Sequence, residues 1–317
     1  MAEPTSAPWP ELALSAWADT RDTLQLWTQV IGKIRLAQTP WLNHSWHVPL
    51  YVNARGLTTS PIAHGSRFFE IQFDFTLHVL DITVSDGRER RLALQPQSVA
   101  DFYAGVMAAL ADLGVAVAIN EMPCEIAGAT AFSRDRVHAA YDPDYARRFW
   151  QVLLQTDRLL KRFRTGFLGK SSPVHFFWGG FDLAVTRFSG RRAPPYAGKI
   201  PGLKLEVMQE AYSHEVSSAG FWTGGGGVDY PAFYSYAYPI PAGFRESTVQ
   251  PAAAFWSDTL GEFLLPYDAV RTSADPDAAL LAFLQSTYEA AAITAHWDRA
   301  ALECPRGRPG VPRDSST

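Results

Sequence analysis

Helix-period and strand-period segments alternate along this chain, and the same order occurs twice. A helical stripe of apolar residues over 17–34 precedes an alternating segment at 46–55, and a second stripe over 145–163 precedes a strand-like segment at 174–188. Apolar residues at helical spacing predict amphipathic helices, whereas strict alternation predicts half-buried strands. Because helices and strands come in separate groups, we predict an α+β fold in which helices cover antiparallel β-sheets.

An antiparallel meander is predicted between residues 69 and 94, with a turn at 85–87. Ser98 begins a capping-box pattern, which predicts the start of a helix over 99–113. A short strand is predicted at 115–119. The pair Gly179-Gly180 predicts a bulge or a close approach of another backbone.

The two patterned segments, 46–56 and 180–190, are similar enough to predict two related helix–strands–helix halves. The alternative is two unrelated α+β modules. The predicted organisation is a flexible segment at 1–12, a first α+β half at 13–120, a linker at 121–141, a second α+β half at 142–302 and a disordered tail at 303–317.

Composition limits the class of protein. The net charge of −4 predicts no general attraction to nucleic acid or to an anionic membrane surface. No stretch approaches the roughly 20 apolar residues of a membrane span, and the first residues lack the pattern of a signal peptide, so we expect a cytoplasmic protein. Cys124 and Cys304 are far apart and form neither a disulfide framework nor a metal-binding motif.

Five motifs make the chain recognisable. They are Trp46-His-Val-Pro-Leu-Tyr-Val52, Leu57-Thr-Thr-Ser-Pro61, Ser172-Pro-Val-His-Phe-Phe-Trp-Gly179, Tyr212-Ser-His-Glu-Val-Ser-Ser-Ala-Gly-Phe-Trp222 and Gly261-Glu-Phe-Leu-Leu-Pro-Tyr267. With them the chain resembles a bacterial family catalogued as domain of unknown function 5996, from about Trp9 to Arg299. The resemblance implies no reaction, cofactor or catalytic residue. It favours one whole-chain unit over two separable domains.

A row of hydrogen-bonding side chains is the first candidate site. His47, Tyr51, Asn53 and Arg55 share one face of the predicted strand at 46–55. If this face lines a cleft, it supplies an acid–base group and anion-binding groups. The alternative is an ordinary solvated face. On the second patterned strand, Asp182 occupies a corresponding position.

Histidines and a glutamate form the second candidate. His47, His175, His214 and Glu215 are the predicted catalytic residues, and three histidines with a carboxylate also suit a transition metal. Their spacing matches no standard metal motif, so hydrogen-bonded histidines that line a pocket or core are the alternative. Whether a metal or any other cofactor binds stays unknown.

If segment 174–188 pairs with 212–222, Arg187 lies near Glu215, which predicts a cross-strand ion pair. As an alternative, Arg187 clamps a carboxylate or phosphate of a ligand. Trp178 and Trp222 are predicted core residues, with the lining of an apolar ligand cavity as their alternative role.

Together these patterns predict a small-molecule-binding protein, and we add the hypothesis that it is an enzyme. The predicted pocket is lined by His, Arg and Tyr and lies between the two halves. The predicted ligand-binding residues are Tyr51, Asn53, Arg55, Asp182, Arg187, Trp178 and Trp222. Two alternatives stay open: a non-catalytic interaction or homodimerisation module, and a metal-dependent enzyme that uses the His/Glu cluster.

Overall fold

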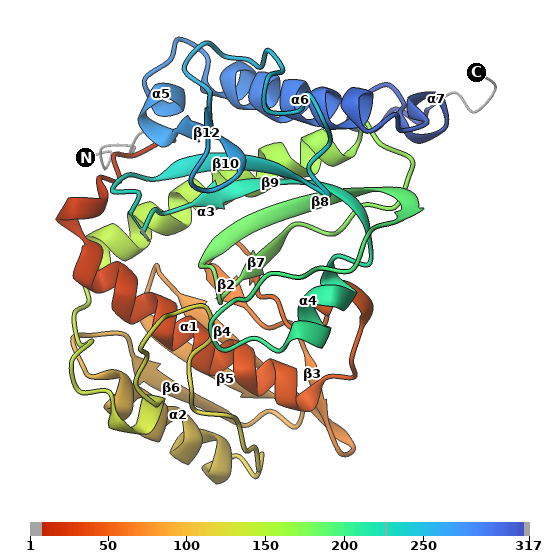
Figure 1. Ribbon diagram of the computed structural model, residues 1–317. Coiled ribbons are helices and arrows are strands. Elements are labelled where there is room, and N and C mark those ends of the chain that lie inside the picture. The colour runs from red at the N-terminus through yellow and green to blue at the C-terminus, as the bar shows by residue number, and fades with distance from the viewer. Residues whose placement is uncertain (1–7, 226, 314–317) are drawn as a thin grey trace. The chain divides into compact units, whose positions relative to one another are not determined.

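The computed structural model describes residues 8–225 and 227–313 (Figure 1). Two compact units divide the chain, and neither is continuous in sequence. The first unit contains the residues up to Leu154 together with His175–Asp182 and Tyr196–Ala211; the second contains Gln155–Val174, Leu183–Pro195 and the residues from Tyr212 onward. Residues 142–154, 175–182 and 196–211 are predicted to belong to the second half, but they lie in the first unit.

The first unit is built on an antiparallel sheet with the strand order β1-β2-β4-β5-β6, in which β3 also pairs with β4. Its strands are β1 (Tyr51–Val52), β2 (Gly56–Thr58), β3 (Ile62–His64), β4 (Arg67–Asp74), β5 (Val79–Val84) and β6 (Glu89–Ala93). The helices of this unit are α1 (Ala18–Gln38), α2 (Val99–Asp112), α4 (Leu205–Ala211) and the three short 3-10 turns η1 (Leu14–Ala16), η2 (Asn43–Ser45) and η3 (Phe132–Arg134).

Aromatic rings join α1, α2 and the sheet into one core. Trp27 of α1 stacks on Phe102 of α2 with 4.6 Å between ring centroids, and Phe73 of β4 lies 6.3 Å from Phe102. All three side chains are buried. The alternation predicted for β4 therefore sends its apolar face toward the two helices, which confirms the predicted layering.

The second unit contains an antiparallel sheet with the strand order β11-β12-β10-β9-β8-β7. Its strands are β7 (His175–Phe177), β8 (Asp182–Arg192), β9 (His214–Trp222), β10 (Ala232–Tyr238), β11 (Phe255–Ser257) and β12 (Glu262–Pro266). Of these, β7 and Asp182 belong to the first unit. The helices are α3 (Pro143–Arg164), of which only residues from Gln155 belong to this unit, α5 (Tyr267–Arg271), α6 (Pro276–Thr294) and α7 (Arg299–Leu302).

Predicted helix starts are confirmed where a side chain caps the backbone. The Ser98 hydroxyl accepts a hydrogen bond from the Asp101 N–H at 3.1 Å and begins α2. The Asp275 carboxylate accepts from the Ala278 N–H at 2.9 Å and begins α6. These contacts are local, so the sequence alone predicts them. The predicted α+β class with antiparallel sheets is likewise confirmed.

Two predicted strands are wrong. Residues 115–119 contain no strand. In the segment 46–55 only Tyr51 and Val52 are in a strand, because η2 comes first and positive φ angles at His44 (58°) and Ser45 (56°) turn the chain. The predicted polar row on one strand face is therefore not formed. The matching segment near 182–192 forms the 11-residue strand β8, so the two patterned segments become different elements, and the duplication stays a prediction.

Parts of the predicted flexible ends are packed. Trp9 and Leu12 are buried in the first unit, and the Cys304 N–H donates to the Gly166 carbonyl at 3.3 Å in the second. Residues 1–7 and 314–317 lie outside the described residues. None of the described helices combines the length and apolar character needed to span a membrane.

Candidate functional site

The predicted site residues fall into both units, so each group is described within its own unit. His47, Tyr51, Asn53, Arg55, His175, Trp178 and Asp182 belong to the first unit, and Arg187, His214, Glu215 and Trp222 to the second. Among the described residues, no group of three or more His, Cys, Asp or Glu side chains is arranged to hold a metal ion.

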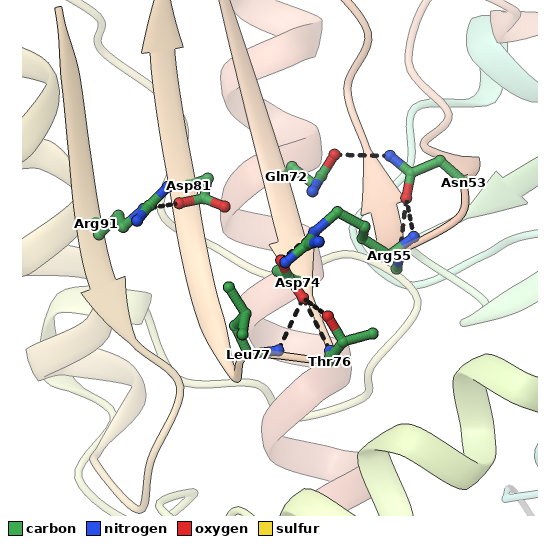
Figure 2. A network of polar contacts seen from close by, with 9 residues as sticks. Asn53, Arg55, Gln72, Asp74, Thr76, Leu77, Asp81 and Arg91 are labelled. Atoms are coloured by element: carbon green, nitrogen blue, oxygen red, sulfur yellow. Dashed lines mark hydrogen bonds and ion pairs between the residues drawn. The ribbon is translucent and has the colours of Figure 1, made fainter.

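Asn53 and Arg55 are held by the sheet of the first unit (Figure 2). The Asn53 side chain accepts hydrogen bonds from the N–H of Arg55 and of the next residue, both at 2.9 Å, and donates to Gln72 at 2.8 Å. Arg55 forms an ion pair with the fully buried Asp74 carboxylate. Burial favours the neutral form of Asp74, but hydrogen bonds from the following turn and from Arg55 outweigh it and hold its pKa below the usual value. These contacts fix the β1–β2 turn.

His47 is also held by local structure. Its Nδ1 accepts a hydrogen bond from the Leu42 N–H at 3.1 Å, and its carbonyl accepts one from Arg35 Nε at 2.8 Å. Burial lowers the pKa of the His47 imidazole. The buried, neutral imidazole accepts a hydrogen bond from the backbone of the loop that contains it, and this contact holds the chain between α1 and β1.

Tyr51 and His175 do meet, although they come from distant segments. The Tyr51 hydroxyl lies 3.5 Å from His175 Nε2, and the Arg35 guanidinium lies 5.3 Å from the centroid of the Tyr51 ring. The Trp46 ring is 6.0 Å from that of His175. His175 is fully buried, whereas Tyr51 is half-buried, so only the tyrosine reaches solvent.

A row of buried polar side chains on α1 contacts two irregular segments of the first unit. Gln25, Gln29 and Lys33 follow at intervals of four residues and therefore share one helix face. Gln25 donates to the Gly179 carbonyl at 2.7 Å. The Gln29 amide donates to the carbonyl of Cys124 and accepts from its N–H, both at 2.9 Å. The row thus ties two irregular segments to α1.

Trp178 packs against α1 at a position where only glycine fits. Its indole N–H donates to the Val48 carbonyl at 2.9 Å. A β-carbon on Gly32 would overlap the indole ring. The predicted core role of Trp178 is in keeping with its burial.

Two carboxyl groups meet beside the Gly179-Gly180 pair. A β-carbon on Gly180 would lie 2.8 Å from Asp182 Oδ1 and 3.6 Å from Glu125 Oε2, so both carboxyl groups border the same small space. On Gly179 a β-carbon would lie 2.7 Å from the Glu125 carboxyl carbon. The glycine pair was predicted to mark a bulge or a close approach of another backbone, and the group that approaches it is instead the Glu125 side chain.

Glu125 is positioned by backbone contacts on an irregular segment. Its N–H donates to the Pro201 carbonyl at 2.7 Å, and its φ angle of 62° is unusual for a residue with a side chain. No described side chain donates a hydrogen bond to its carboxyl group. Burial, and then the neighbouring charge of Asp182, raise the pKa of Glu125 to about 7. The residue as a whole is exposed, whereas its carboxyl group lies close against the Gly179 backbone.

This pair has the chemistry of a general acid–base group. A pKa of about 7 leaves comparable amounts of the protonated and ionised forms at neutral pH. Perturbed carboxyl pairs of this kind are enriched at functional sites. Asp182 was predicted from the sequence, but Glu125 was not, because its segment shows neither helix nor strand periodicity. The Gly179-Gly180 pair is the sequence feature that could have pointed to a close contact at this place.

In the second unit, the predicted ion pair between Arg187 and Glu215 is wrong. Glu215 pairs with Arg191 at 2.7 Å and accepts a hydrogen bond from Ser189 at 2.9 Å. The hydrogen bond places Ser189 beside Glu215, and Arg187, two residues earlier in β8, is only 1% exposed. There its guanidinium lies 3.5 Å from the Phe163 ring centroid.

An aromatic enclosure surrounds that guanidinium. The ring centroids of Tyr288 and Phe167 lie 4.3 Å and 5.0 Å away, and one N–H of Arg187 donates to the Phe163 carbonyl at 2.6 Å. Burial lowers the pKa of Arg187 to about 10. No room for a ligand carboxylate is evident around so buried a group, which favours a packing role.

His214 and Trp222 are the first and last residues of β9. The Ser213 hydroxyl lies 3.0 Å from His214 Nδ1, and Trp222 pairs with Ala232 of β10. Both residues are half-buried, and they are separated by the length of the strand. Their predicted catalytic and ligand-binding roles stay predictions.

Comparison with known proteins gives a family but no activity. A search of curated proteins and a search of solved structures each found no match. The model of a family described as a family of unknown function (DUF5996) matches residues 9–304. The motifs that suggested this resemblance lie within that range, and the chain therefore belongs to the DUF5996 family.

Proposed function

We propose that this protein binds a small molecule at the Glu125–Asp182 carboxyl pair and that Glu125 exchanges a proton with it. The observation that carries the proposal is the position of both carboxyl groups beside Gly180, with a solvent-accessible Glu125 whose pKa is raised to about 7. Every residue of the proposed site belongs to the first unit.

The roles of the two carboxyl groups differ. Glu125 donates its proton to a basic atom of the ligand when protonated, and accepts one from an acidic atom when ionised. Asp182 supplies negative charge that keeps the proton on Glu125 at a higher pH than for an isolated glutamate. Gln25 and Gln29 hold the two backbone segments that carry the pair.

Tyr51 and His175 form a second polar pair in the first unit. His175 begins and Asp182 ends the same short segment, which α1 contacts at Gly179. The half-buried Tyr51 hydroxyl beside His175 offers a second polar contact to a ligand. The raised pKa of Glu125 beside Asp182 supports the hypothesis of an enzyme over a purely structural module, because perturbed carboxyl groups are enriched at functional sites.

A ligand screen with matched variants tests the proposal. Ligand-observed NMR against a library of small metabolites should find a compound that binds the wild-type chain and is lost in Glu125→Gln and Asp182→Asn. Glu206→Gln is the control, because Glu206 is an exposed glutamate of α4 in the same unit. Binding should also change between pH 6 and pH 8. A compound that binds all four proteins equally at both pH values would refute a role for the pair.

A further inference from the structure

An open surface cavity of about 550 Å³ lies along α6 in the second unit, far in sequence from the carboxyl pair. One stripe of α6 lines it, with Leu281, Gln285 and Glu289 at four-residue intervals, and Arg162 of α3 and Arg306 complete the wall. All of these residues belong to the second unit. The volume is within the range of small-molecule sites, roughly 300–1,000 Å³.

The carboxylates that line this cavity are already bound by the protein. Asp277 forms two hydrogen bonds with Arg158, both at 2.7 Å. Asp275 caps the Ala278 N–H at 2.9 Å. A cationic ligand would have to displace these contacts, so the cavity does not favour one.

Glu289 is engaged in the same way. Its carboxylate accepts a hydrogen bond from Gln285 at 2.9 Å and contacts the Arg299 guanidinium at 3.4 Å. Two of the three lining carboxylates, Asp277 and Glu289, are therefore paired with arginines that do not line the cavity.

Unlike the lining carboxylates, the two arginines that line the cavity have few hydrogen-bond partners in the protein. Arg306 makes one hydrogen bond, to Gln285 at 3.3 Å. The Arg162 guanidinium makes no hydrogen bond or ion pair with the residues that the structure describes, although its charge helps to lower the pKa of Asp277. A guanidinium group offers five N–H donors in a fork that matches carboxylate and phosphate oxygens. Most donors of this pair are free for a ligand.

The floor of the cavity is apolar. Leu281 is buried at 6% exposure, and Ala278 and Ala282 lie beside it on α6. A ligand that binds both the two arginines and the apolar floor has an oxyanion at one end and a short apolar chain at the other.

We propose that this cavity binds a small amphiphilic anion whose oxyanion is held by Arg162 and Arg306 and whose apolar chain lies on Leu281 and Ala282. The proposal does not depend on the carboxyl pair of the first unit. It assigns the second unit a ligand site that the histidine, glutamate and aromatic patterns of the sequence did not indicate.

Isothermal titration calorimetry on the full chain tests it, with hexanoate, acetate and inorganic phosphate as probes. Hexanoate should bind more tightly than acetate or phosphate, because only hexanoate covers the apolar floor. Arg162→Gln and Arg306→Gln should each weaken hexanoate binding at least fivefold. Arg192→Gln, an exposed arginine of β8 in the same unit, is the control and should bind as the wild type does.

Filling the cavity provides a second variant. Ala282→Trp should abolish hexanoate binding while circular dichroism shows the same melting behaviour. Absence of hexanoate binding to the wild type, or equal binding by the Arg162, Arg306 and Arg192 variants, would overturn the proposal. Phosphate that binds as tightly as hexanoate would overturn the role of the apolar floor and leave a general anion site.

Discussion

Glu125→Gln should make the protein more stable above pH 7 and leave its stability nearly unchanged below pH 4. In the folded chain the pKa of Glu125 is raised from 4.5 to about 7, so the folded state keeps a proton that the unfolded state loses between these values. Where the folded state binds more protons, the free energy of unfolding falls as pH rises. The wild type therefore loses stability across this window, whereas the uncharged glutamine does not.

The size of the effect is set by solvent screening. Without solvent screening, a rise in the pKa from 4.5 to about 7 corresponds to a loss of about 3.4 kcal/mol in the free energy of unfolding. Glu125 is accessible to water, which screens part of this cost, so we expect about 1 kcal/mol. Gln keeps the shape of the protonated side chain and fits the same space beside Gly179.

Urea denaturation at pH 4, 5, 6, 7 and 8 measures this difference. The free energy of unfolding of Glu125→Gln minus that of the wild type should rise by about 1 kcal/mol between pH 4 and pH 8. All other titrating groups are shared and cancel in the difference. Asp182→Asn should move the rise to lower pH, because it removes the charge that helps to hold the proton. A difference that stays constant with pH would show that the pKa of Glu125 is not raised.

Substitutions at three positions test the packing within the two units. Gly32→Ala should cost about 1–3 kcal/mol, because the new methyl group overlaps Trp178, and tryptophan fluorescence and the melting temperature should report the shift. Gln29→Ala should cost about 2 kcal/mol and speed the reaction of Cys124 with a thiol reagent, because two backbone hydrogen bonds to Cys124 are lost. Arg187→Met should unfold at the same urea concentration as the wild type or higher, because a packed apolar chain replaces a poorly solvated guanidinium without leaving a void. Arg187→Ala should unfold at a lower urea concentration, because it leaves a void.

Local contacts explain what was predictable from the sequence. The helix starts at Ser98 and Asp275 depend on residues three positions apart, and the alternation of β4 depends on its immediate neighbours. Each pattern is complete within a few residues, so no knowledge of the rest of the chain is needed. The segment at 46–55 departs from its predicted strand because the chain turns at His44 and Ser45. Leu50 forms only a single bridge with Phe176, and Tyr51 and Val52 alone pair with β2.

The amino-acid sequence by itself determined the α+β class, the main helices and strands, and the presence of Asp182, Tyr51 and His175 among the polar groups worth testing. Only the tertiary structure decided which of them meet. Glu125 becomes distinctive because the chain brings its carboxyl group against Gly179, Gly180 and Asp182, more than fifty residues away in the sequence. A pKa depends on that three-dimensional surrounding, and no local pattern of residues records it.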